Sequence, residues 1–234
     1  MNTTRASRPI PLGLTLLVAC FSAFAALALT NGHDAQAHGN AVDHDSAAAQ
    51  STAPSAKQVA LRIEMRRLWE DHITWTRLAI ISLTSSSPDT DATVARLLRN
   101  QVDIGNAVKP FYGTAAANEL TRQLRQHILI AADVIAAAKA GDAAKLADAQ
   151  ARWVRNADTI AAVLNSVNPR HWKLGALKAE MHMHLDLTTQ EVVARLKGDW
   201  KADVVAYDKV HRHILHMSDA LAAGLVKQFP ARFR

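Results

Sequence analysis

Apolar residues recur every three or four positions through most of this chain, and this spacing predicts α-helices because such positions share one helix face. Proline, glycine and short serine or asparagine runs interrupt the pattern. These breaks divide the chain into six predicted helices, at residues 55–86, 92–108, 114–140, 142–167, 170–197 and 199–228. No stretch shows the sustained alternation of a β-strand, so we expect an all-α fold.

The short breaks also predict how the helices are arranged. Helices that are joined by short loops pack as antiparallel neighbours, so the sequence predicts an antiparallel helical bundle. We expect a four-helix core formed by residues 55–86, 114–140, 170–197 and 199–228. The two remaining helices should pack against that core.

The first 37 residues have the features of an export signal. Two arginines precede an apolar run at 10–29, and Ala35-Gln36-Ala37 offers small residues for cleavage. Residues 1–37 are therefore predicted to be a signal peptide. The mature protein would start at His38 and would be periplasmic or extracellular.

Two alternatives would attach the protein to a membrane through this segment. The apolar run is long enough to remain as an uncleaved anchor, and Leu17-Val18-Ala19-Cys20 fits a lipoprotein cleavage box. Cys20 is the only cysteine, so no intramolecular disulfide can form. Residues 38–55 are polar without apolar periodicity and predict a flexible linker, which leaves 56–234 as the helical bundle domain.

The charge of the chain argues against one class of partner. There are 27 lysines and arginines and 21 acidic residues, a net charge of +6 over 234 residues, without a dense basic run. Proteins that bind nucleic acids usually concentrate basic residues on one face. We therefore expect no nucleic-acid partner.

Histidines fall at the midpoints of the four predicted core helices. They are His72, His127, His184 and His211. The midpoints of antiparallel helices share one level, and a boundary error of two residues moves a midpoint by only about 1.5 to 3 Å. Apolar neighbours three and four positions away predict that His72 and His127 point inward. The sequence thus predicts a buried layer of histidines, whereas His213 shares a face with Lys209 and should contact solvent.

Carboxylates near this layer give it the composition of a metal site. Asp208-x-x-His211 places a carboxylate and an imidazole on one side of a helix, comparable to the Glu-x-x-His units of di-iron bundles. The candidate metal ligands are His72, His127, His184, Asp208 and His211, with Glu191 as an additional or supporting carboxylate. Such groups bind copper, zinc, iron or manganese, and nearby methionines favour copper. A metal-binding carrier, store or sensor is the leading functional hypothesis.

Two other functions fit the same pattern. The layer can be purely structural, because buried histidines commonly bond to neighbouring polar groups and fix helix packing. The protein would then be a structural or protein-interaction module. Two facing histidines can also hold haem without a covalent bond in a redox protein. A Ser/His/Asp triad cannot be assigned, so the sequence favours a binding protein over an enzyme.

Several short runs carry a resemblance to known proteins. They are LWEDHITWTR at 68–77, RLLRN at 96–100, PFYG at 110–113, NAD at 156–158 and QFP at 228–230. Together they resemble a family of small, exported, all-helical bacterial proteins without an established activity. Members sometimes carry names such as acetylglutamate kinase or glycosyltransferase. The chain has no glycine-rich phosphate loop and no α/β alternation, which argues against a nucleotide-binding enzyme.

Overall fold

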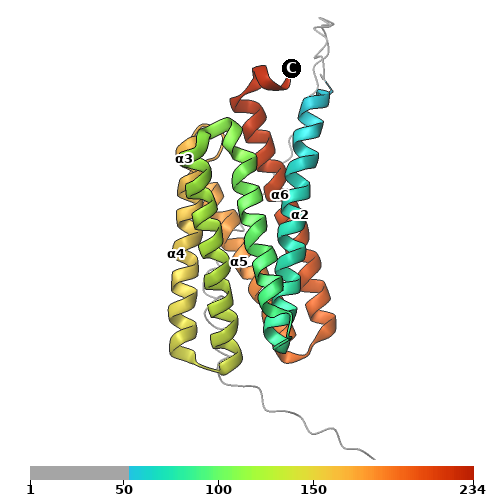
Figure 1. The fold of residues 1–234 in the computed structure, drawn as a ribbon, viewed down its shortest axis with the longest axis vertical. Helices are drawn as coiled ribbons and strands as arrows, with labels where there is room; N and C mark the ends of the chain where they lie inside the picture. The colour runs from blue at the N-terminus through green and yellow to red at the C-terminus, as the bar shows by residue number, and fades with distance from the viewer. Residues whose placement is uncertain (1–52) are drawn as a thin grey trace, which may run out of the picture.

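The computed structural model describes residues 53–234 and is all-α over that range (Figure 1). Its elements are α2 (Ala56–Ser85), α3 (Thr90–Ala140), α4 (Ala143–Val167), α5 (Leu174–Lys197), α6 (Trp200–Gln228) and the short 3-10 helix η1 (Pro230–Phe233). The predicted all-α class is confirmed. The predicted signal peptide at 1–37 and most of the predicted linker at 38–55 lie outside the described residues.

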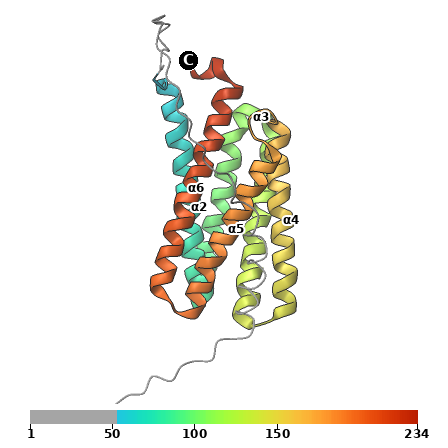
Figure 2. The ribbon, with the colours of Figure 1, turned by 180° about the vertical axis from the view of Figure 1, so that it is seen from behind.

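The five α-helices pack antiparallel in a bundle (Figures 1 and 2). Helix α3 reverses direction at Gly113, which has φ 80° and ψ 176°. Arg125 Nη1 donates to Leu98 O at 3.1 Å, so the segments before and after the reversal lie side by side. They correspond to the helices predicted at 92–108 and 114–140. The chain turns at Gly113 and not at Pro110, because glycine adopts a positive φ without steric cost.

The two segments of α3 approach each other closely at Gly105. A Cβ atom at this position would lie 1.9 Å from Thr121 Oγ1 and 3.0 Å from Ala117 O. Any larger side chain would therefore push the two segments apart. Gly105 sets how tightly this pair of segments can pack.

Local sequence determines the other turns. Gly141 and Gly198 both have φ 69°, the left-handed conformation that commonly ends a helix. The Asp142 side chain then accepts a 3.0 Å hydrogen bond from the backbone N–H of Lys145. This bond satisfies one of the N–H groups that a helix start leaves free. The predicted breaks at these positions are confirmed.

Every α-helix contributes to one apolar core. The main buried cluster includes Ile73 of α2, Ile104 of α3, Ile160 of α4, Leu185 of α5 and Ile214 of α6. Helix α4 therefore buries its apolar face in the same cluster as the four helices that carry the histidines.

The first and last elements of the bundle meet. Ser55 caps α2 and donates its hydroxyl to Phe233 O at 2.5 Å. Arg62 and Arg66 of α2 each make two hydrogen bonds of 2.8 or 2.9 Å to the Asp219 carboxylate of α6. Helix α2 is thus held between α3 and α6.

We expect Gly105→Ala to destabilise the protein, because its Cβ collides with Thr121 Oγ1. Overpacking costs about 1 to 3 kcal/mol, of which the better helix propensity of alanine recovers about 1 kcal/mol. Urea unfolding would measure the loss. In a Thr121→Ala background, where the nearest colliding atom is gone, the same replacement should destabilise the protein less. An equal loss in both backgrounds would show that the close approach is not the cause.

Candidate functional site

Three of the predicted histidines converge in the middle of the bundle. His72, His127 and His184 come from α2, α3 and α5, and each is at most 4% exposed. The ring centroids of His72 and His184 are 5.9 Å apart, and those of His127 and His184 are 6.3 Å apart. The predicted convergence is confirmed for these three.

The fourth ring in this layer is His213 and not His211. His213 stacks on His184 with a centroid distance of 6.2 Å, and its Nε2 lies 3.0 Å from Glu180 O. The prediction that His213 contacts solvent is wrong, because α5 packs against this side of α6 and covers it. We call His72, His127, His184 and His213 the histidine layer.

His211 and Asp208 lie outside the histidine layer, contrary to the prediction. His211 Nε2 is 2.7 Å from Glu70 Oε1, in an ion pair that is accessible to solvent. Asp208 is exposed. Their face of α6 lies next to the outer edge of α2, so their i, i+3 spacing produces no inward-facing pair.

Glu191 is buried but belongs to a different cluster. Its Oε1 accepts a 2.7 Å hydrogen bond from Arg77, which also makes two 3.0 Å bonds to Asp203. Arg195 makes another 3.0 Å bond to Asp203. Glu191 follows His184 by seven residues, which is about 10.5 Å along a helix. Burial raises the pKa of Glu191 to about 7, although Arg77 favours its charged form.

The hydrogen bonds of His127 identify it as a structural residue. His127 Nδ1 is 2.8 Å from Asn156 Oδ1, which can only accept, so Nδ1 carries the proton. Trp153 Nε1 donates to His127 Nε2 at 3.1 Å. The Asn156 amide in turn donates to the backbone and side-chain oxygens of Gln123. Both ring nitrogens are engaged, so His127 has no free lone pair for a metal.

The buried imidazoles are neutral at physiological pH. Burial lowers the pKa of His72 to about 3 and that of His127 to about 4. Burial also holds the pKa of His184 well below its ordinary value, and the neighbouring histidines lower it further. His72 Nδ1 lies 3.3 Å from the amide nitrogen of Gln101, consistent with an unprotonated Nδ1.

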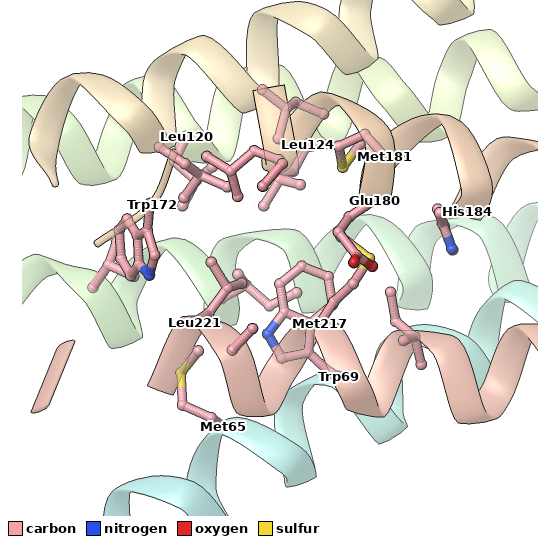
Figure 3. Close-up of a pocket in the computed structure, with 18 of the residues that line it drawn as sticks. Met65, Trp69, Leu120, Leu124, Trp172, Glu180, Met181, His184, Met217 and Leu221 are labelled. Carbon is pink, nitrogen blue, oxygen red and sulfur yellow. The ribbon is translucent and has the colours of Figure 1, made fainter. Parts of the chain in front are cut away.

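An apolar cavity of about 170 Å³ lies against the histidine layer, in the half of the bundle that contains the start of α5 and the end of α6 (Figure 3). Leucines, isoleucines, two tryptophans and three methionines form most of its wall; those labelled in the close-up are Met65, Trp69, Leu120, Leu124, Trp172, Met181, Met217 and Leu221. His72, His127 and His184 close its inner end. Exposed Lys173, Ala176 and Ala220 mark where it opens to solvent.

Three buried polar atoms in the cavity wall have no hydrogen-bond partner. They are Trp69 Nε1, Trp172 Nε1 and His184 Nδ1. Buried N–H groups are nearly always bonded to something. Sequence reasoning missed this cavity, because apolar residues at helical spacing look the same whether they pack tightly or line a space.

Trp172 is also without an indole partner, but its packing accounts for its position. A Cβ atom on Gly224 would lie 1.9 Å from Trp172 Nε1, so the edge of the indole rests on the α6 backbone. Asn168 Nδ2 donates to Gly224 O at 3.1 Å, and Asn165 Nδ2 donates to Trp172 O at 2.8 Å. These bonds fix the α4–α5 connection, which lies at the outer end of the cavity.

Within residues 53–234, no three His, Cys, Asp or Glu side chains are already arranged to hold a metal ion. The sequence matches no protein-family model, no curated protein and no solved structure. The resemblance to exported helical proteins therefore stays a prediction. No helix in the described part of the chain has the length and apolar character needed to cross a membrane.

We expect the free energy of unfolding to rise with pH between about 4 and 6.5. In this range His72, His127 and His184 take up protons only when unfolded, because burial lowers their folded pKa values. The unfolded state then binds more protons, so stability increases with pH, by at most about 1.4 kcal/mol per unit for each histidine. Urea unfolding across the window would measure this slope.

Glu191 acts in the opposite direction. Its pKa of about 7 lies above that of an unfolded glutamate, so its contribution is greatest below about pH 4.5 and is lost as the pH rises through 7. Glu191→Gln should therefore steepen the rise, whereas replacing the exposed His216 by Gln should leave the profile unchanged. A wild-type profile that is flat or falls over this window would contradict the assignment of neutral buried histidines.

Proposed function

We propose that this protein binds a small apolar molecule in the cavity against the histidine layer and acts as a carrier, store or sensor. The observation that carries the proposal is an apolar cavity of about 170 Å³ whose wall holds unpartnered buried polar atoms, among them Trp69 Nε1 and His184 Nδ1. An apolar cavity of about 150 Å³ in another protein stays dry and binds benzene. This cavity is of comparable size.

The energetic cost of the cavity supports this reading. At about 24 cal/mol per Å³, a cavity of 170 Å³ that held neither water nor ligand would cost about 4 kcal/mol. That is a large fraction of the stability of a typical domain, which is about 5 to 15 kcal/mol. A bound molecule would offset this cost by filling the space.

The chemistry of the wall favours binding over catalysis. A general acid or base works best with a pKa near the operating pH, whereas burial lowers the pKa of His72 to about 3 and that of His127 to about 4. His127 is also fully engaged with Asn156 and Trp153.

Export remains part of the proposal. The features of residues 1–37 predict a signal peptide, which would place the four-helix core and its ligand in the periplasm or outside the cell. A carrier or sensor of small molecules would have direct access to its ligand there.

Filling the cavity should abolish binding. Leu124 lines the cavity and is 5% exposed, whereas Leu129 on the same helix is 50% exposed. We expect the wild type to bind benzene or toluene, with a rise in unfolding free energy of about 2.7 kcal/mol at a hundred times the dissociation constant. Leu124→Phe should lose this effect because the added ring occupies the space.

The matched control is Leu129→Phe, which adds the same ring on the outer surface and should keep the ligand-induced stabilisation. Ligand-observed NMR would measure binding independently of stability. If neither apolar probe binds the wild type, the proposed function is wrong.

Metal binding is the second candidate function, with a ligand set different from the predicted one. His184 lies between His72 and His213, with ring centroids at 5.9 and 6.2 Å. His213 Nε2 faces a backbone carbonyl, as the second nitrogen of a metal-bound histidine commonly does. Met181 and Met217 line the adjoining cavity, and thioether sulfur favours Cu(I). The rings would have to rotate to share one ion.

Titration of untagged protein with Cu(I) against a coloured chelator would test this candidate. We expect one ion per chain, with retention lost in His184→Asn and His213→Asn but kept in the exposed control His216→Asn. Thermal stability must be followed alongside, because a buried histidine also holds packing. If all three variants retain Cu(I) equally well, the histidine layer is not the metal site.

A further inference from the structure

The indole of Trp69 projects from α2 into the cavity (Figure 3) and has a fixed orientation. It is 7% exposed, and it makes an edge contact with His72 at a centroid distance of 5.6 Å. An indole N–H can only donate a hydrogen bond. Its Nε1 has no partner among the described residues, so the cavity presents a donor that is held in place and unused.

The other two buried tryptophans differ from Trp69 in what their indole nitrogens contact. Trp153 Nε1 donates to His127 Nε2 at 3.1 Å. Trp172 Nε1 rests against Gly224, where its packing leaves no room for a side chain. Trp69 and Trp172 are thus the two buried indoles of the described part without a hydrogen-bond partner, and Trp172 differs in that its nitrogen rests against Gly224 of α6.

His184 supplies a second polar atom in the same wall. Its Nδ1 is buried and unpartnered, and its ring is neutral because burial keeps its pKa low. A neutral imidazole nitrogen either donates or accepts, according to the tautomer. The inner part of the cavity therefore combines one certain donor with one adaptable group.

The charges of the cavity favour an uncharged ligand. Among the described residues that line it, the formally charged side chains are Lys173 and Glu180, and Lys173 is exposed at the opening. Apart from Glu180, whose carboxylate lies 3.6 Å from His213 Nδ1, the inner wall consists of apolar side chains and neutral rings (Figure 3). Burying an unpaired carboxylate or ammonium group there would be costly.

We infer that the ligand is a neutral single-ring molecule with one oxygen, a hydroxyl or carbonyl group, that accepts a hydrogen bond from Trp69 Nε1–H. This inference rests on the proposed function and specifies its ligand class. The ring fills the space between the leucines and methionines, and the oxygen satisfies the indole donor. Phenol combines one ring with one hydroxyl oxygen, so it is the smallest probe that tests this ligand class.

The test compares phenol with toluene, which has the same shape without the oxygen, by titration calorimetry on the purified protein. We expect the wild type to bind phenol at least as tightly as toluene, although phenol is better solvated by water. Trp69→Phe keeps the aromatic ring and removes the N–H. This replacement should weaken the affinity for phenol about tenfold or more, because phenol loses a buried hydrogen bond. It should change the affinity for toluene less than about threefold.

Trp75→Phe is the matched control, since Trp75 belongs to a different apolar cluster and does not line the cavity. It should leave the affinities of both probes unchanged. If the Trp69→Phe variant does not fold, the test uses NMR of the wild type and follows the Trp69 indole N–H resonance instead. This resonance should shift downfield with phenol and much less with toluene.

The outcomes separate the inference from the proposed function. If toluene binds but the ratio of phenol to toluene affinity is the same in Trp69→Phe as in the wild type, the inference is wrong and the cavity is simply apolar. Tighter binding of benzoate than of phenol would also overturn it, in favour of an anionic ligand. If neither phenol nor toluene binds the wild type, both proposals fall.

Discussion

At the middle of the bundle, imidazole rings from three helices lie against one another in an apolar interior. A proton on any of them would be poorly solvated and would repel the others, so His72, His127 and His184 all have to stay neutral. A neutral imidazole still needs hydrogen-bond partners, and α4 provides both of them for His127. Asn156 and Trp153 of α4 bond both nitrogens of His127, which connects α4 to α3 at this level.

The histidine layer divides the interior into two halves with different properties. On one side, Arg77 and Arg195 hold Glu191 and Asp203 in a buried network that links α2, α5 and α6. On the other side is the cavity, which is lined mainly by apolar side chains. The first half links three helices through buried charges, and the second half encloses the cavity.

Much of the fold could be predicted from the sequence, because helix ends and apolar stripes are local features. Gly141 and Gly198 ended helices as expected, and the apolar neighbours of His72 and His127 correctly placed both rings inside. The predictions failed where packing between distant segments determines which side chains are buried and which of them pair. His213 is covered by α5, His211 pairs with Glu70 at a separation of 141 residues, and Glu191 pairs with Arg77 at a separation of 114. No local pattern reports such pairs, nor does it distinguish the bonded indole of Trp153 from the unbonded one of Trp69.

The contact between the two ends of the bundle has a consequence for the order of folding. Ser55 and Phe233 are separated by 178 residues, and Arg62 and Arg66 are about as far from their common partner Asp219. Contacts between residues so far apart in sequence slow folding, because a long loop must close before they form. During synthesis, which proceeds from the N-terminus, α2 appears first and one side of it waits for the last helix. Until α6 arrives, the face of α2 that packs against it in the native bundle has no partner.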